Sequence, residues 1–168
     1  GGEDVALTER NYDSGGPSEE HGRSRTTKTA VYDPVEHRSV AFHREGQDLV
    51  VPVELGPGTG RLLMFTPRPI ESIELLGPEE ISRGALWEGK LKLTDTAGQT
   101  LQAVLPVQLE ILDPDGRLAE WSGFYGAVNG QLDLKLDIAK NDRKGIWEIR
   151  VHDLAGGLRF TRFFRVID

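Results

Sequence analysis

The stretch Val104–Gly116 reads VLPVQLEILDPDG and places one strand directly before one turn. Apolar and polar side chains alternate from Val107 to Ile111, and Leu112 follows. This two-residue period gives a strand one apolar and one solvated face. The run ends on Asp113–Gly116, in which Pro fixes φ, Asp accepts hydrogen bonds from its own turn, and Gly can take a positive φ. The stretch therefore predicts one arm of an antiparallel hairpin.

A later stretch, Gly145–Asp153 (GIWEIRVHD), is the expected partner of this strand in the core. Its side chains divide between an apolar face with Trp147, Ile149 and Val151, and a polar face with Glu148, Arg150 and His152. The same alternation recurs in Gln131–Ala139, where all the even-numbered positions are apolar. These strands predict sheets that bury one face each.

Short alternating runs separated by Gly, Pro and Asp occur along the whole chain after residue 28, and no sustained helical period is present. The strongest helical candidate, Pro78–Gly84, is too short to form a stable helix. Turn signals at intervals of roughly 8–12 residues are typical of sandwiches and barrels. We therefore predict an all-β fold, an Ig-like antiparallel β-sandwich preceded by a small antiparallel β-meander.

We divide the chain near residue 70, into a polar arm (1–28), a small β-meander (29–70) and the sandwich (71–168). The meander is expected to have four strands, at residues 29–32, 39–43, 49–55 and 61–66. Pro52 lacks an N–H group, which favours an edge or a bulge for its strand. Pro106 is likewise expected to interrupt the run from Thr100 to Leu112.

The arm is rich in polar and turn-forming residues, a composition typical of linkers. We expect it to lie across a sheet, anchored by Val5 and Leu7. A binding loop is the alternative.

The composition limits the classes of partner. The chain has 168 residues, a formal net charge of −7 and no cysteine. An acidic surface disfavours nucleic acid and anionic membranes as partners, and the lack of cysteine excludes disulfides and thiolate metal sites. No apolar run reaches the roughly 18 residues of a membrane helix. The chain begins Gly1-Gly2, as expected of a processed chain or a piece of a longer protein.

The second half resembles a known group of modules. Pro106-Val107 opens a strand, Asp113–Gly116 closes it, and Gly145 precedes Trp147 at the start of another. This order resembles macroglobulin-type and bacterial Ig-like β-sandwich modules over residues 70–168. The resemblance implies a structural role in a large exported protein, without catalytic residues. The thioester and bait regions of full macroglobulins have no counterpart here.

The first half resembles, through Gly46–Leu49 and Pro57–Leu63, the small β-domains at the C-terminus of many large glycoside hydrolases. That resemblance implies an accessory domain of a larger bacterial enzyme or surface protein. The resemblance of the second half implies an extracytoplasmic location, either periplasmic or secreted.

Residues with catalytic or metal-binding chemistry do not form a recognisable motif. Asp113, Asp115 and Gly116 match part of a calcium loop, but the remaining ligands of an EF-type loop are missing. The four histidines have no zinc-hydrolase spacing, although His37 and His43 could meet across a hairpin. No nucleophile elbow or phosphate loop occurs. We therefore expect no enzymatic activity, no cofactor and no metal.

Trp121 and Tyr125 are the candidate ligand-binding residues, because clustered aromatic rings on a β-sandwich can stack on sugar rings. Packing in the core is the competing interpretation, since aromatic side chains fill much of a small sandwich. The sequence predicts a non-catalytic structural or interaction module that contacts other domains of the same protein or a protein partner. The alternative is a carbohydrate-binding or substrate-positioning domain of a glycoside hydrolase.

Overall fold

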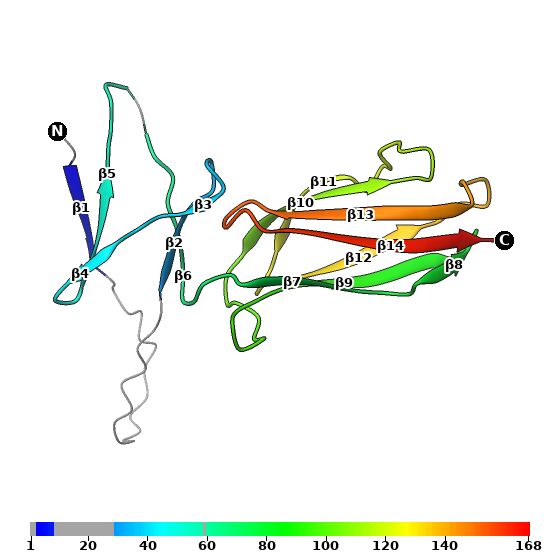
Figure 1. The fold of residues 1–168 in the computed structure, drawn as a ribbon, viewed down its shortest axis with the longest axis horizontal. Coiled ribbons are helices and arrows are strands. Elements are labelled where there is room, and N and C mark those ends of the chain that lie inside the picture. Colours follow the sequence, from blue (N-terminus) through cyan, green and yellow to red (C-terminus); the bar gives the residue numbers. More distant parts are fainter. Residues whose placement is uncertain (1–2, 9–28, 59) are drawn as a thin grey trace, which may run out of the picture.

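The computed structural model describes residues 3–8, 29–58 and 60–168, and for residues 3–8 it describes the backbone alone. Every regular element in these ranges is a β-strand (Figure 1), which confirms the expected all-β fold. The strands are β1 (Glu3–Thr8), β2 (Ala30–Asp33), β3 (Arg38–Ser39), β4 (His43–Glu45), β5 (Asp48–Val53), β6 (Met64–Thr66), β7 (Ser72–Leu76), β8 (Glu80–Ser82), β9 (Leu86–Thr94), β10 (Leu105–Leu112), β11 (Gly123–Ala127), β12 (Gln131–Asp137), β13 (Gly145–Asp153) and β14 (Arg159–Ile167).

Strands β7–β14 form the predicted Ig-like sandwich. One sheet has the order β11-β10-β13-β14-β8 and the other has the order β12-β9-β7. All pairs are antiparallel except β8 with β14. The expected pairing of Val107–Leu112 with the later strand is confirmed, because Leu109 lies opposite Val151 and Ile111 opposite Ile149. The expected hairpin is confirmed by the pairing of β10 with β11.

The turn after β10 has the chemistry that its sequence predicts. Asp113 Oδ1 accepts the N–H groups of Asp115 and Arg117 at 2.9 Å each. Gly116 has a φ of 77°, which L side chains rarely adopt. The local sequence therefore determines where β10 ends.

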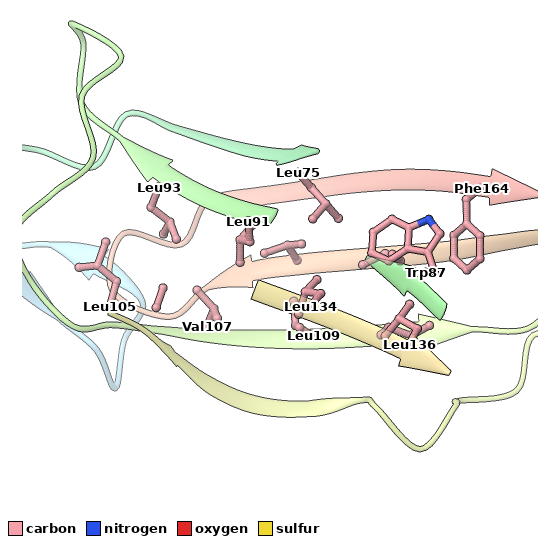
Figure 2. Packing of buried hydrophobic residues seen from close by; sticks show 14 of the residues in the cluster. Leu75, Trp87, Leu91, Leu93, Leu105, Val107, Leu109, Leu134, Leu136 and Phe164 are labelled. Carbon is pink, nitrogen blue, oxygen red and sulfur yellow. The ribbon is translucent and has the colours of Figure 1, made fainter. Parts of the chain in front are cut away.

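One apolar cluster fills the space between the two sheets of the sandwich (Figure 2). Trp87 from β9 is fully buried, and its ring lies 5.2 Å from that of Phe164 in β14. A Cβ atom at Gly77 or Gly89 would lie 2.4 or 2.3 Å from the Trp87 ring, so both positions require glycine. Trp87 Nε1 donates to Pro78 O at 2.9 Å, so the buried ring has no unpaired N–H.

One local expectation needs correction. Strand β10 begins at Leu105 and is not interrupted at Pro106, because that residue lies just beyond the β10–β13 ladder and its missing N–H costs no ladder bond. Its carbonyl instead accepts the Leu154 N–H at 3.0 Å. The segment Pro78–Gly84 forms no helix, as its short length predicts, and it contains strand β8, because it gains backbone partners along β14.

Strands β1–β6 form two three-stranded sheets, ordered β1-β5-β4 and β3-β2-β6, which we call the N-terminal sheets. The expected antiparallel hairpins β2–β3 and β4–β5 are present. The segment 39–43, expected as one strand, is divided between β3 and β4, which lie in different sheets. Pro52 lies beyond the end of β4, so β5 has only β1 as a neighbour there. A small cluster of Val31, Val51 and Val53 is buried here.

The expected N-terminal arm is described only in part. Its residues 3–8 form β1, which pairs with β5 along its full length. Residues 9–28 and the side chains of Val5 and Leu7 lie outside the described residues. The anchoring role of these two side chains and the alternative of a binding loop therefore stay predictions.

Candidate functional site

The N-terminal sheets lie at one end of the sandwich (Figure 1). Tyr32 of β2 is one residue by which they contact it. Its side chain joins the apolar cluster of the sandwich and is 4% exposed. The Ile70 N–H donates to Tyr32 Oη at 2.7 Å, so the buried hydroxyl is paired. Burial raises the pKa of Tyr32 despite this hydrogen bond. We call this region, with the turn at residues 153–157, the joint.

The sandwich side of the joint is built by Asp153, at the end of β13. Its fully buried carboxylate accepts the N–H groups of Ala155 at 3.0 Å and Gly156 at 2.9 Å. Burial raises the pKa of Asp153, and the backbone N–H groups of its own turn oppose that rise. The carboxylate therefore holds the turn that the N-terminal sheets contact.

His37, in the turn between β2 and β3, packs on this same turn. Its φ is 51°, and its Nδ1–H donates to Leu154 O at 2.8 Å. A Cβ atom at Gly157, whose φ is 81°, would lie 2.4 Å from the His37 carbonyl oxygen. Only glycine allows this approach, so the two turns fit closely.

The structure brings His37 to His152 rather than to His43. The rings of His37 and His152 lie edge to face, with centroids 5.1 Å apart. His43 instead contacts Glu45 at 3.1 Å. The possible contact of His37 with His43 across a hairpin is therefore wrong, because β3 and β4 separate into different sheets.

A groove of about 650 Å³ lies beside this pair, on the outer face of the five-stranded sheet. We call it the junction groove; it is lined by His37, Gln108, Glu110, Arg150, Val151, His152, Arg159, Phe160 and Thr161. Strand register places Gln108, His152 and Arg159 in one row across three strands. Glu110, Arg150 and Thr161 form the adjacent row. Six polar side chains therefore occupy neighbouring positions.

Charges in the junction groove are unevenly balanced. Arg150 is held by both carboxylate oxygens of Glu148, at 2.7 and 3.0 Å, and lies 3.9 Å from Glu110. Arg159 has no ion-pair partner among the described residues. Burial lowers the pKa of His152, and the positive charges of Arg159 and His37 lower it further, while Glu110 opposes them. The row that contains Arg159 is therefore the more positive end of the junction groove.

Two further carboxylates near the joint serve their own turns. The backbone N–H of Gln99 is the main cause that lowers the pKa of Asp95, and Arg68 adds to it. The backbone N–H of Glu36 is likewise the main cause that lowers the pKa of Asp33. Asp33 also pairs with Arg61 at 2.9 Å. Both groups are fixed in the ionised, hydrogen-bonded state that suits structure rather than proton transfer.

The predicted ligand-binding residues lie elsewhere on the sandwich. Trp121 and Tyr125 are half-buried and pack against the main cluster. The Trp121 ring lies 6.4 Å from that of Trp147, and Tyr125 Oη donates to Trp121 O at 2.7 Å. The aromatic ring most open to solvent in this stretch is that of Phe124, which is 74% exposed. Alternation along β11 is the sequence signal that separates the exposed Phe124 from the half-buried Tyr125.

The calcium-like turn is occupied by protein contacts. Asp115 lies 3.2 Å from Arg143 and 3.6 Å from Arg117. Over the described ranges, no group of three or more His, Cys, Asp or Glu side chains is arranged to hold a metal ion.

The residues of the junction groove were not predicted as a set from the sequence, because they come from three strands and a distant turn.

Comparisons with known proteins extend the fold description. No protein-family model matches the sequence, and no curated protein matches it. Among solved structures, the Lin-41 filamin domain has a TM-score of 0.43 and 18% identity, over 56% of this chain and 91% of that chain. The PKD domain of an M14-like peptidase from Thermoplasmatales archaeon SCGC AB-540-F20 has a TM-score of 0.36 and 18% identity, over 57% and 93%.

A superoxide reductase (neelaredoxin) from Ignicoccus hospitalis has a TM-score of 0.43 and 9% identity, covering 58% of this chain and 82% of that chain. At these TM-scores and identities, the likenesses assign no function to this chain. A separate observation concerns membranes: in the part of the chain that the structure describes, no helix is long and apolar enough to cross one.

Proposed function

We propose that this chain is a non-catalytic structural or interaction module of a larger exported bacterial protein, with a small β-region (29–70) set rigidly on a sandwich (71–168). The contacts at the joint are the observation on which this proposal rests. Tyr32 is buried in the sandwich core, and His37 is hydrogen-bonded to a turn that Asp153 organises. A flexible linker would not need such contacts. The resemblance to macroglobulin-type modules supports a spacer or docking role outside the cytoplasm.

Rigidity of the joint is the property to test. Residual dipolar couplings from the N-terminal sheets and from the sandwich are expected to fit one common alignment tensor. A variant with His37→Ala and Tyr32→Phe is expected to need two tensors, because the hydrogen bond from His37 to Leu154 is lost and the buried Ile70 N–H loses its acceptor. Two independent tensors in the unaltered chain would contradict the proposed rigid module.

The exported location needs a separate experiment on the full-length protein. Fractionation of the native bacterial cells, with an antibody against this chain, is expected to recover it from the periplasm or the medium. Recovery in the cytoplasm would refute the location and leave the rigid joint unaffected.

The second candidate function is an accessory domain that binds carbohydrate. The exposed ring of Phe124, beside the half-buried Trp121 and Tyr125, favours it, because exposed aromatic rings can stack on sugars. Retardation of the chain in gels that contain polysaccharide tests this function. A Phe124→Ala variant that is retarded as strongly as the unaltered chain would exclude this surface.

A further inference from the structure

The junction groove has the volume of a small-molecule site. Its volume of about 650 Å³ falls within the roughly 300–1,000 Å³ that is usual for such sites. The outer face of the sheet forms its floor, and His37 from the N-terminal sheets borders one end. A ligand in the groove would therefore contact both parts of the molecule.

The charges of the groove select an anion. Arg150 is already balanced by Glu148 and Glu110, whereas Arg159 has no carboxylate partner in the described part of the chain. The free guanidinium of Arg159 lies in the same row as His152, next to His37. A planar guanidinium pairs best with a carboxylate or a phosphate, through two parallel hydrogen bonds.

The neighbours of Arg159 favour a single negative charge. Glu110 is in the adjacent row and would repel a dianion more than a monoanion. Thr161 and Gln108 offer hydroxyl and amide groups that can both donate and accept hydrogen bonds. These groups suit a ligand with hydroxyl groups around its carboxylate.

We propose that the junction groove binds a sugar acid of the uronate class, with its carboxylate on Arg159 and its hydroxyl groups on Gln108, His152 and Thr161. Phe124, the exposed ring beside Trp121 and Tyr125, lies opposite Gln108 in the strand register, so the site adjoins that aromatic surface. It goes beyond the structural role, and the dipolar-coupling test of the rigid joint can succeed whether or not this site exists.

The test uses the whole chain and defined probes. Galacturonate and its short oligomers are titrated against the chain, with galactose, acetate and inorganic phosphate as comparisons. Amide and imidazole NMR signals of the groove residues are followed. Galacturonate is expected to shift the signals of His152 and Thr161 in a saturable way, and galactose is expected to leave them unchanged.

Two matched arginine variants test the role of Arg159. Arg159→Gln is expected to weaken galacturonate binding at least tenfold, because it removes the charged pair. Arg165→Gln, on the same strand and the same exposed face but outside the groove, is expected to keep the affinity. Both side chains are exposed, so neither substitution is expected to disturb the fold. The amide spectra of the two variants check that the fold is retained.

Three outcomes would overturn the proposal. One is the lack of a saturable shift with galacturonate and its oligomers. Another is tighter binding of phosphate than of galacturonate, which would assign the groove to a different anion. The third is equal weakening by both variants, which would indicate general attraction to positive charge.

Discussion

The sandwich core is buried and the joint is buried only in part, and the two are held by different interactions. The core is apolar, and its two sheets meet through side chains such as Trp87 and Phe164. The joint combines one buried aromatic ring with hydrogen bonds of Tyr32, His37 and Asp153. Apolar burial is non-directional, whereas hydrogen bonds depend on geometry. The comparison shows that the core gives stability and the joint gives orientation.

A difference in pH response follows from the same contrast. The aliphatic and aromatic side chains of the core carry no group that titrates near neutral pH. The joint and its surroundings contain Asp95, Asp153 and His152, whose pKa values all depart from their ordinary range. Changes of pH are therefore expected to act on the joint before they act on the core.

Removing the largest core side chain is expected to have the largest effect. Trp87→Ala should lower the free energy of unfolding by about 3–5 kcal/mol, because it empties a fully enclosed space between the sheets. Urea unfolding followed by circular dichroism measures the change. Phe163→Ala, at a ring that is 57% exposed, is the control and should change the stability much less. Equal losses in both variants would show that the core does not dominate stability.

Removing one hydroxyl from the joint is expected to have a smaller and more local effect. Tyr32→Phe should cost about 1–3 kcal/mol, because the buried Ile70 N–H loses its acceptor. Amide hydrogen exchange should show the loss of protection at Ile70 first. Tyr125→Phe removes a similar hydroxyl inside the sandwich. If that variant exposed Ile70 to the same extent, the joint would not be a separate structural unit.

The smallest predicted effect concerns Arg68 and Asp95, next to the joint. Asp95 Oδ1 accepts the N–H groups of Ala97 and Gln99, and Oδ2 faces Arg68. Asp95→Asn therefore keeps the turn and loses the ion pair. The pKa of Asp95 is below its ordinary value of 3.8, so the ionised group stabilises the fold above about pH 4. This stabilisation is lost as the pH falls through the lower, folded-state pKa.

Thermal unfolding of the unaltered chain and of Asp95→Asn, between pH 7 and pH 2, measures this effect. The variant should be less stable at pH 7, and the difference should disappear at the acid end. Asp137→Asn, at an exposed position on β12, is the control. A difference that persists unchanged at pH 2 would contradict the role of the charge.

Many strand positions could be predicted because the signal is local. Alternation placed Leu109 and Ile149 on buried faces, and the Asp-Pro-Asp-Gly turn located the end of β10. Alternation also placed His152 and Arg150 on one polar face, which is the face that lines the junction groove. What the alternation lacked was any indication of which strands stand next to each other.

The errors have the same origin. Pro106 was interpreted from local propensity, yet it lies where no ladder bond is needed. The contact of His37 with His152 also depends on a distant turn. Each outcome was decided by a neighbour far away in the sequence.

The sequence by itself determined the strands, the turns and the polar or apolar identity of each face, because these depend on side-chain period and on the φ preferences of a few residues. The order of the strands, the burial of Tyr32 and the assembly of the junction groove were decided only by the tertiary structure. The physical reason is that register and sheet order follow from packing the whole core at once, and no single stretch contains that information.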